Sequence, residues 1–309
     1  MKPVITFNKL CVLKTIGFLL ILCAANMSIM AENAATVKTK FVETGGRKIA
    51  YRSIGKGTPL ILANRFRGNL DVWDPLFLDS LAKNFQVITF DYSGFGLSTG
   101  KPPTDILGFA KDVKDLAEAL KFKKIIVGGW SFGGFVAQIV TTEFPEIVSH
   151  AVLIGTNPPG KNALGIEPIF FEVSRRPSYT VEDEAILFFE PKSEKSRRAA
   201  QASRDRIAQR KTDLDVRIPE TLWDNYTKGG DDYFADPYTA REKMQQTKIP
   251  ILLISGDHDV CFPIENWIAL SRRLPTTQLI VFPHAGHGPQ HEFPELTADY
   301  INNFIQMSK

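Results

Sequence analysis

The chain has 309 residues, 44% of them hydrophobic, and a formal net charge of +3. This length and apolar content suffice for one large domain, or for a core with an insertion. The three surplus positive charges are Lys2, Lys9 and Lys14, because residues 1–31 contain no acid. The remainder is neutral, which excludes a strongly basic chain of the kind that binds nucleic acid by charge alone.

The N-terminal segment has the pattern of an export signal. A positively charged stretch, Lys2–Lys14, precedes an apolar run over residues 16–30 that is short for a membrane-spanning helix. We expect residues 1–31 to be a signal peptide, so that the protein is secreted or periplasmic. An uncleaved N-terminal membrane anchor is the alternative. Beyond this segment Cys261 is the single cysteine, which leaves no intramolecular disulfide after processing.

From about residue 39 onward, apolar runs alternate with helical patterns. Two alternating segments around Gly45-Gly46 predict a β-hairpin over residues 41–52. Short β-branched runs predict buried strands, and apolar residues at helical spacing predict the helices between them. The strands are expected at 59–63, 85–90, 125–128, 151–154, 249–254 and 278–282, and the helices at 73–82, 105–120, 264–274 and from about 293. This alternation predicts an α/β fold, with a mostly parallel, twisted sheet covered by helices on both faces.

The alternation stops after Thr156. The stretch Asn157-Pro158-Pro159-Gly160 is a strong breaker, and no strand-like run follows until about Lys248. Helical patterns fill this gap at residues 181–189, 193–211 and 219–228. We therefore expect residues 157–248 to form a helical cap, inserted into an α/β core made of residues 39–156 and 249–309.

The most informative stretch is Gly129-Trp130-Ser131-Phe132-Gly133. It matches Gly-x-Ser-x-Gly between an apolar run and a helix of small residues, which is the strand–turn–helix context of a nucleophile elbow. A serine in such a turn needs unusual backbone dihedral angles, and flanking glycines avoid the clash that a Cβ would cause. The helix that follows directs its free N–H groups toward the hydroxyl. Ser131 is therefore the candidate nucleophile.

Two later loops contain candidates for a base and an acid. Gly256-Asp257-His258-Asp259 follows one predicted strand, and Gly286-His287 follows the next. Catalytic groups in open α/β sheets gather beyond the carboxyl ends of the strands. A serine hydroxyl needs a base within hydrogen-bond reach, histidine suits that task, and a carboxylate must orient the imidazole. Both Asp257 and Asp259 are candidates for this carboxylate.

With these motifs, the chain from about Thr39 to its end resembles the α/β-hydrolase superfamily, and within it the single-domain esterases and the haloperoxidase-like and proline-iminopeptidase-like relatives. The segments that carry the resemblance are Gly129–Gly133, Asp91–Ser98, Gly256–Asp259 with Pro263, and Gly286-His287. The resemblance implies that Asp259, three residues after the glycine, is the acid and that His287 is the base. It also implies that no cofactor and no metal take part.

One loop departs from the family pattern. The family usually has His-Gly after its third strand, where this chain has Asn64-Arg65 followed by Phe66. The resemblance places the oxyanion donors at the backbone N–H groups of Phe66 and Phe132. Arg65 in place of glycine changes the conformational freedom of this loop without removing a backbone donor.

Three side chains near these donors are candidate substrate contacts: Arg65, Arg67 and Trp130. A guanidinium is planar, permanently charged and suited to carboxylates, so one of the arginines could bind an acid group of the substrate. The alternative is that both arginines fix the loop by pairing with acids of the surface or the cap, for instance Asp71, Asp74 or Glu182.

Together these residues predict a cofactor-free serine hydrolase that acts on a small molecule. Ser131 attacks an acyl carbon, His287 takes and returns the proton, and Asp259 orients His287. A carboxylic ester is the first expectation, and an amide, a lactone or an N-terminal prolyl bond stay open. Two further interpretations are a perhydrolase of the haloperoxidase-like kind, which makes a peracid with the same residues, and a binding protein of this fold with little turnover.

Overall fold

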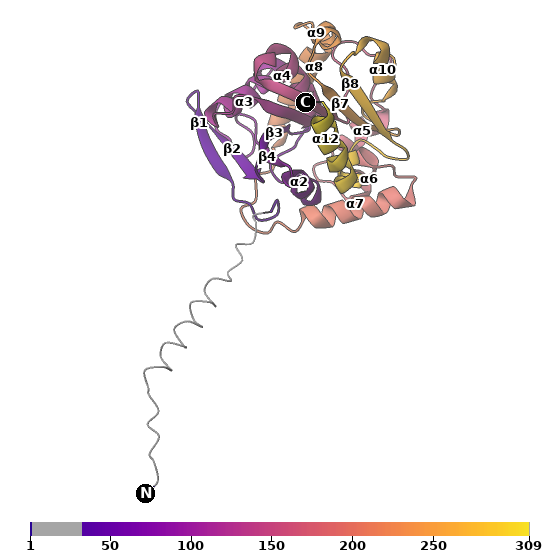
Figure 1. The fold of residues 1–309 in the computed structure, drawn as a ribbon. Coiled ribbons are helices and arrows are strands. Elements are labelled where there is room, and N and C mark those ends of the chain that lie inside the picture. The colour runs from indigo at the N-terminus through magenta and orange to yellow at the C-terminus, as the bar shows by residue number, and fades with distance from the viewer. Residues whose placement is uncertain (2–32, 309) are drawn as a thin grey trace. The chain divides into compact units, whose positions relative to one another are not determined.

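An eight-stranded sheet organises the part of the chain that this computed structural model describes, which is Met1 and residues 33–308 (Figure 1). The signal peptide or anchor predicted at residues 1–31 lies outside it, apart from Met1. The strand order is β1-β2-β4-β3-β5-β6-β7-β8. Strands β1, β2 and β4 pair antiparallel, and all other neighbours pair parallel. The strands are β1 (Lys40–Thr44), β2 (Arg47–Ile54), β3 (Thr58–Ala63), β4 (Phe85–Phe90), β5 (Ile125–Trp130), β6 (Val148–Ile154), β7 (Ile251–Gly256) and β8 (Thr277–Phe282).

Helices cover both faces of this sheet, which confirms the predicted fold class. Successive residues of a strand point to opposite faces. In β3, Ile61 therefore packs in one apolar layer, with α3 (Ile106–Ala119) and α4 (Phe132–Glu143). Its neighbour Leu62 packs in the other layer, with α2 (Pro75–Ala82) and α12 (Pro294–Met307), which lie side by side (Figure 1). Burial on both faces explains why the parallel strands are almost continuously apolar.

Residues 157–248, all of them described, contain helices and no strand. The three predicted helical patterns correspond to α6, α7 and α8, whereas the seven-residue helices α5 and α9 were not predicted. The helices are α5 (Pro168–Ser174), α6 (Val181–Phe188), α7 (Glu194–Ile207), η2 (Glu220–Leu222), α8 (Trp223–Ala235) and α9 (Ala240–Gln246). Tyr233 of α8 stacks on Phe135 of α4 with ring centroids 4.1 Å apart, and Lys243 of α9 pairs with Glu143 at 2.9 Å. Helices α8 and α9 therefore pack on a helix of the predicted core. The structure does not separate them from that core, so the boundary of the cap at residue 248 stays a prediction.

The remaining short elements differ in detail from the expected pattern. The helix predicted over residues 264–274 is present as α10 (Glu265–Ile268) and a 3-10 turn, η3 (Ser271–Arg273). A second 3-10 turn, η1 (Pro145–Ile147), leads into β6, and α11 (Pro289–Glu292) follows the loop of His287.

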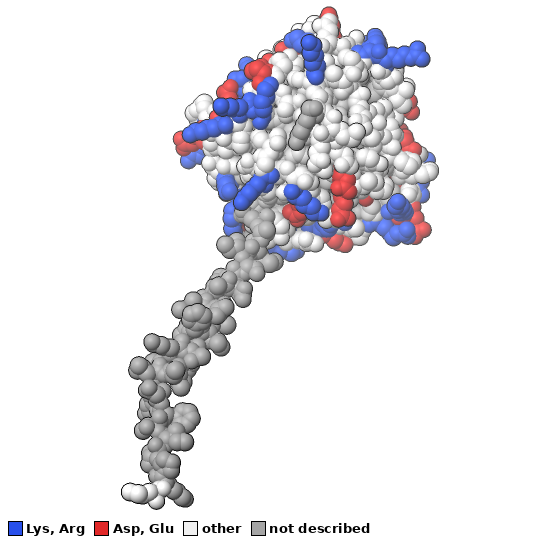
Figure 2. Space-filling model, viewed as in Figure 1, with Lys and Arg blue, Asp and Glu red and all other residues white. Residues whose placement is uncertain are grey.

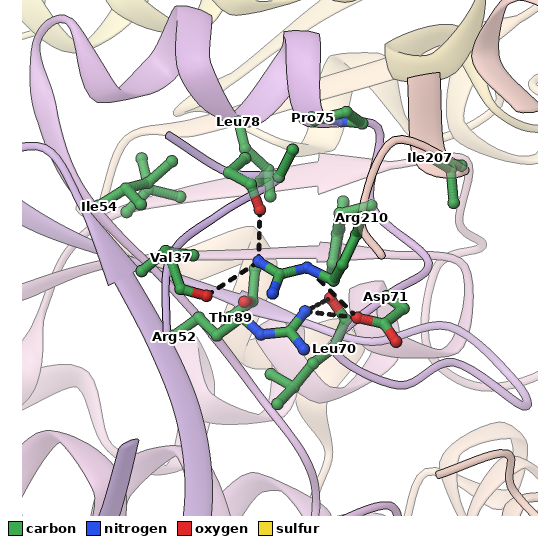
Figure 3. A pocket seen from close by; sticks show the side chains of 14 residues that line it. Val37, Arg52, Ile54, Leu70, Asp71, Pro75, Leu78, Thr89, Ile207 and Arg210 are labelled. Carbon is green, nitrogen blue, oxygen red and sulfur yellow. Dashed lines mark hydrogen bonds and ion pairs between the residues drawn. The ribbon is translucent and has the colours of Figure 1, made fainter. Parts of the chain in front are cut away.

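A buried cluster of hydrogen bonds and ion pairs ties residues 34–37 to the rest of the fold (Figure 3). Nη2 of Arg210 donates to the carbonyl oxygens of Ala34 at 2.7 Å and Val37 at 3.0 Å. Beside it, Nη1 of Arg52 donates to Oδ1 of Asp71 at 2.5 Å. Both guanidinium groups are nearly inaccessible to solvent, so these charge-assisted bonds make the segment from Ala34 to Val37 part of the folded unit.

On the molecular face shown in Figure 2, lysine and arginine side chains are interspersed with aspartate and glutamate. This mixing agrees with the neutral charge of the chain beyond residue 31. Within the described part of the chain, no helix has the length and apolar character needed to cross a membrane.

Candidate active site

Ser131 occupies the turn between β5 and α4, with φ 59° and ψ −120°. Its backbone N–H donates to the carbonyl oxygen of Ile154 in the neighbouring strand at 2.9 Å. A Cβ at Gly129 would overlap the backbone of Gly133, and a Cβ at Gly133 would overlap the carbonyl of Ala63. The left-handed serine and the close approach of its glycines are the geometry that the motif predicts.

His287 and Asp259 form a buried pair beyond the ends of β8 and β7. Nδ1 of His287 lies 2.8 Å from Oδ2 of Asp259, and the two side chains are 1% and 0% exposed. Oδ1 of Asp259 accepts the backbone N–H groups of Cys261 and Phe262, both at 2.8 Å. The carboxylate is thus fixed by two donors, and its second oxygen orients the imidazole. Nε2 of His287 is buried and has no hydrogen-bond partner among the described residues, so it is available to a reacting group.

Asp257, the other candidate acid, faces a different partner. Its Oδ1 lies 2.6 Å from Nδ1 of His258 near the surface, and this hydrogen bond raises the pKa of His258. The ring of His258 stacks on that of His284 at 5.7 Å. The structure therefore brings Asp259, and not Asp257, to His287.

Ser131 and His287 line one small cavity, which we call the catalytic cavity. It holds about 10 Å³, which is room for about one water molecule. Its other walls come from the loop after β3 and from residues 157–248: Arg65, Phe66, Phe170, Ser174, Tyr179, Leu187 and Phe188. In the described conformation this volume is too small for an organic substrate.

Asn64 holds the loop that carries the candidate oxyanion donor Phe66. Its side chain is fully buried, donates from Nδ2 to the carbonyl of Phe90 at 2.7 Å, and accepts at Oδ1 from Nε1 of Trp73 at 2.7 Å. The hydroxyl of Tyr92 donates to the carbonyl oxygen of Asn64 at 3.0 Å. Sequence reasoning treated Asn64 only as a departure from the family pattern. A polar residue at the end of a buried strand was the signal for this positioning role.

The backbone of this loop accommodates arginine in place of glycine. The left-handed residue is Arg67, with φ 58°, and Arg65 is not among the described residues of positive φ. The N–H of Gly68 donates to the carbonyl of Arg65 at 2.9 Å, which closes the turn. Phe66 reaches the catalytic cavity, and the N–H of Phe132 is the first of α4, so it has no carbonyl partner within that helix.

Arg67 fixes the loop, but not through the acids that the sequence offered. Its guanidinium group contacts Tyr179 and Trp223, with the ring centroids 4.6 Å and 4.0 Å away. Its hydrogen bonds go to the hydroxyl of Tyr179 and to the carbonyls of Ser174, Arg176 and Pro177. The alternative in which Arg67 pairs with an acid such as Asp71, Asp74 or Glu182 is wrong: Arg67 forms no ion pair with the described residues, Asp71 pairs with Arg52 and Asp74 pairs with Arg206.

Arg65 has a different environment from Arg67. Its guanidinium group lies 4.7 Å from the ring centroid of Phe188 and 5.2 Å from that of Trp130. Among the described residues, its guanidinium group makes one hydrogen bond, from Nη1 to the carbonyl of Phe66 at 2.7 Å. Trp130 in turn donates from Nε1 to the carbonyl of His287 at 2.8 Å.

The remaining histidine near the site, His291, belongs to a separate buried cluster. Its Nδ1 lies 3.0 Å from Oγ of Ser203, which donates to Asp74 at 2.8 Å, and Arg206 binds the same carboxylate. Burial lowers the pKa of His291 to about 4, because the imidazolium is poorly solvated there. In the described part of the chain, no three histidine, cysteine or acidic side chains are grouped so that they could hold a metal ion.

The sequence and the fold of this chain are similar to those of known proteins. The family model of the alpha/beta hydrolase fold matches residues 58–294. A putative non-heme chloroperoxidase from Synechocystis is 27% identical over 305 residues, which cover 91% of this chain and 99% of that protein. The proline iminopeptidase PfmaB from Pestalotiopsis fici is 25% identical over 284 residues, covering 86% and 99%. The solved structure of an alpha/beta hydrolase fold protein from Chitinophaga pinensis superposes with a TM-score of 0.78 at 28% identity, covering 88% and 98%. The chain belongs to the α/β hydrolase fold family.

Proposed function

We propose that the protein is a carboxylesterase-like serine hydrolase, with Ser131 as nucleophile, His287 as general base and Asp259 as the group that orients it. The observation that carries the proposal is the buried pair of His287 and Asp259, 2.8 Å apart, in which His287 lines the same cavity as Ser131 in its left-handed turn. Asp259 accepts a hydrogen bond from the Nδ1–H group of His287. Nε2 of His287 is therefore the ring nitrogen with the lone pair and can act as the base. Membership of a family of hydrolases supports the same chemistry.

In this mechanism Oγ of Ser131 attacks the acyl carbon of the substrate while Nε2 of His287 takes its proton. Asp259 stabilises the imidazolium that forms. The N–H groups of Phe66 and Phe132 donate to the oxyanion of the tetrahedral intermediate. His287 then gives the proton to the leaving group, which breaks the bond and leaves an acyl-enzyme. Water, activated by the same imidazole, hydrolyses that ester in the second half of the reaction.

The charge of the catalytic cavity favours an ester over an N-terminal prolyl bond. An N-terminal amine is cationic at neutral pH, so an aminopeptidase needs a carboxylate beside the reacting bond. The described side chains that line this cavity include no carboxylate, and they include the cation Arg65. We therefore place an ester of a small, neutral or anionic molecule first, ahead of the amide of an N-terminal proline.

The test is turnover of short-chain nitrophenyl esters by the purified protein. Ser131→Ala is expected to abolish turnover, whereas Ser149→Ala is a matched control. The hydroxyl of Ser149 donates to the carbonyl of Ile125 in the sheet and does not line the catalytic cavity. Turnover that survives Ser131→Ala would contradict the proposal.

Two other activities are outcomes of the same experiment. Faster formation of peracetic acid from acetate and peroxide than hydrolysis of any ester would identify a perhydrolase, which the chloroperoxidase relative makes worth measuring. Binding of ligands without turnover of any ester, amide or lactone would identify a binding protein of this fold.

A further inference from the structure

A second cavity adjoins the catalytic cavity. Its volume is about 130 Å³, close to that of engineered cavities that hold a benzene-sized molecule. Arg65 and Phe188 line both cavities and so form the wall between them. The other polar side chains around the second cavity are Asp71, Glu184, Ser203, Arg204 and His291.

The charges around the second cavity are paired, with one exception. Glu184 pairs with Arg204 at 2.9 Å, and Asp71 pairs with Arg52 at 2.5 Å. Arg65 has no carboxylate within 4.0 Å among the described residues. Burial lowers the pKa of Arg65, which shows that its charge is poorly solvated where it lies. Arg65 is partly buried, and the nearby acid Glu184 is already in an ion pair with Arg204, so a cation that is poorly solvated and has no salt bridge of its own favours an anionic ligand at this position.

Two nitrogen atoms of Arg65 that make no hydrogen bond to the described residues are arranged as a carboxylate requires. Nη1 is bonded to the carbonyl of Phe66, whereas Nε is buried without a partner and Nη2 makes no hydrogen bond to the described residues. Nε and Nη2 form one edge of the guanidinium and can donate two parallel bonds to a carboxylate. Contacts with the rings of Trp130 and Phe188 hold the group in place before a ligand arrives.

His291 adds a hydrogen-bond acceptor to the second cavity, whereas Arg65 supplies donors. Ser203 donates its hydroxyl hydrogen to Asp74, so its oxygen accepts the Nδ1 hydrogen of the neutral His291. Nε2 of His291 then carries a lone pair, and it is buried without a partner. The cavity therefore offers a cationic fork for an anion and one acceptor for a hydroxyl or N–H group.

We propose that the second cavity is the subsite for a carboxylate of the substrate, with Arg65 as the residue that determines this specificity. This inference rests on the proposed function. The substrate class is an ester that carries a free carboxylate a few carbons from the scissile bond, and a hydroxyl or N–H near that carboxylate binds Nε2 of His291. Arg65 adjoins the candidate oxyanion donor Phe66, so the carboxylate and the reacting ester lie on the two sides of one short loop.

The test compares esters that differ in one charge. Monomethyl glutarate and its neutral analogue methyl 4-carbamoylbutanoate place the charge on the acyl side, and 3-acetoxypropanoate and 3-acetoxypropanamide place it on the alcohol side. We expect the wild-type protein to prefer the carboxylate of at least one pair by about 10- to 100-fold in kcat/KM, the range of a charge-assisted hydrogen bond. Arg65→Gln is expected to remove that preference, and Arg65→Lys to retain part of it.

Arg67→Gln is the matched control, because Arg67 is an arginine of the same loop that binds carbonyl oxygens of the chain. It is expected to lower the melting temperature and to reduce kcat/KM for both members of each pair alike. The same pattern in Arg65→Gln, or a wild-type protein that prefers neither member of either pair, would overturn the proposal. The wild-type comparison decides the question even if Arg65→Gln does not fold.

A binding measurement separates this proposal from the proposed function. In Ser131→Ala, calorimetry with glutarate and with 3-hydroxypropanoate is expected to show binding of at least one acid that Arg65→Gln weakens by about 10-fold or more. Such binding in a protein whose wild type hydrolyses no ester would contradict the hydrolase and leave the subsite standing. Ester turnover without any binding of these acids would overturn the subsite alone.

Discussion

Nε1 of Trp130 donates a hydrogen bond of 2.8 Å to the carbonyl oxygen of His287. Both side chains are buried, and their rings lie 6.0 Å apart. The residue next to the candidate nucleophile therefore fixes the backbone of the candidate base. A shift of either the turn of Ser131 or the loop of His287 would break this bond. The indole of Trp130 therefore aligns the candidate nucleophile with the candidate base.

Trp130→Phe is expected to reduce kcat and stability together. The variant keeps an aromatic ring but leaves the carbonyl of His287 buried without a donor, which costs about 1–3 kcal/mol. Trp267→Phe is the matched control. Nε1 of Trp267 also donates to a backbone carbonyl, that of Thr156, but Trp267 lines neither cavity. Urea unfolding and ester turnover of both variants check the prediction. An equal loss of kcat in the control would show that the effect is one of stability alone.

Asp259→Asn is expected to lower kcat by about 10⁴-fold if the imidazole is left in the wrong tautomer. Asp257→Asn is expected to cost little activity, since the carboxylate of Asp257 bonds to His258 near the surface and to the N–H of Ala285, and not to His287. Steady-state kinetics of both variants on one nitrophenyl ester make the comparison. The opposite ranking would transfer the role of the acid to Asp257.

The fold was predictable because its signals are local. A buried parallel strand is a short apolar run, and β4 was predicted to the residue at 85–90. The motifs at Ser131, Asp259 and His287 each follow such a strand, so strand positions placed the candidate site. Among the strands, the shifts were confined to the ends: the sequence predicts a strand from residue 151, whereas β6 begins at Val148 and so includes His150.

The features that were not predictable depend on residues far apart in the sequence. Nothing local indicates that Asn64 bonds Trp73 and Phe90, or that Arg65 lies against Phe188 of α6. The partners of Arg67 are mostly backbone carbonyls, which every residue carries, so side-chain charges could not identify them. The helices α5 and α9 are short, and their burial on neighbouring elements outweighs a weak local pattern.

Glu292→Gln is expected to stabilise the protein above pH 7. Burial raises the pKa of Glu292 to about 7, well above its ordinary value, because the carboxylate is poorly solvated. The native state therefore binds more protons than the unfolded state between about pH 4.5 and 7, and stability falls as the pH rises through that window. The gain for the variant is about 2 kcal/mol at pH 8 and shrinks toward pH 4.5. Urea unfolding at both ends of the window measures it, and a gain independent of pH would contradict the assignment.

The mature protein is expected to begin between about Ala25 and Ala35 and to be found outside the cytoplasm. The hydrogen bonds of Arg210 to Ala34 and Val37 support a start before Val37, because a later one would remove both acceptors. N-terminal sequencing of the protein from fractionated cells checks the start and the compartment. Membrane-bound protein that begins with Met1 would instead identify an uncleaved anchor.

Covalent labelling tests the central claim, that Ser131 is a nucleophile activated by His287, most directly. A fluorophosphonate is expected to modify Ser131 alone, and peptide mass spectrometry locates the label. Labelling is expected to disappear in Ser131→Ala and to weaken in acid, since a protonated imidazole cannot accept the serine proton. Labelling that persists in Ser131→Ala, or a folded wild-type protein that takes up no label, would contradict the account.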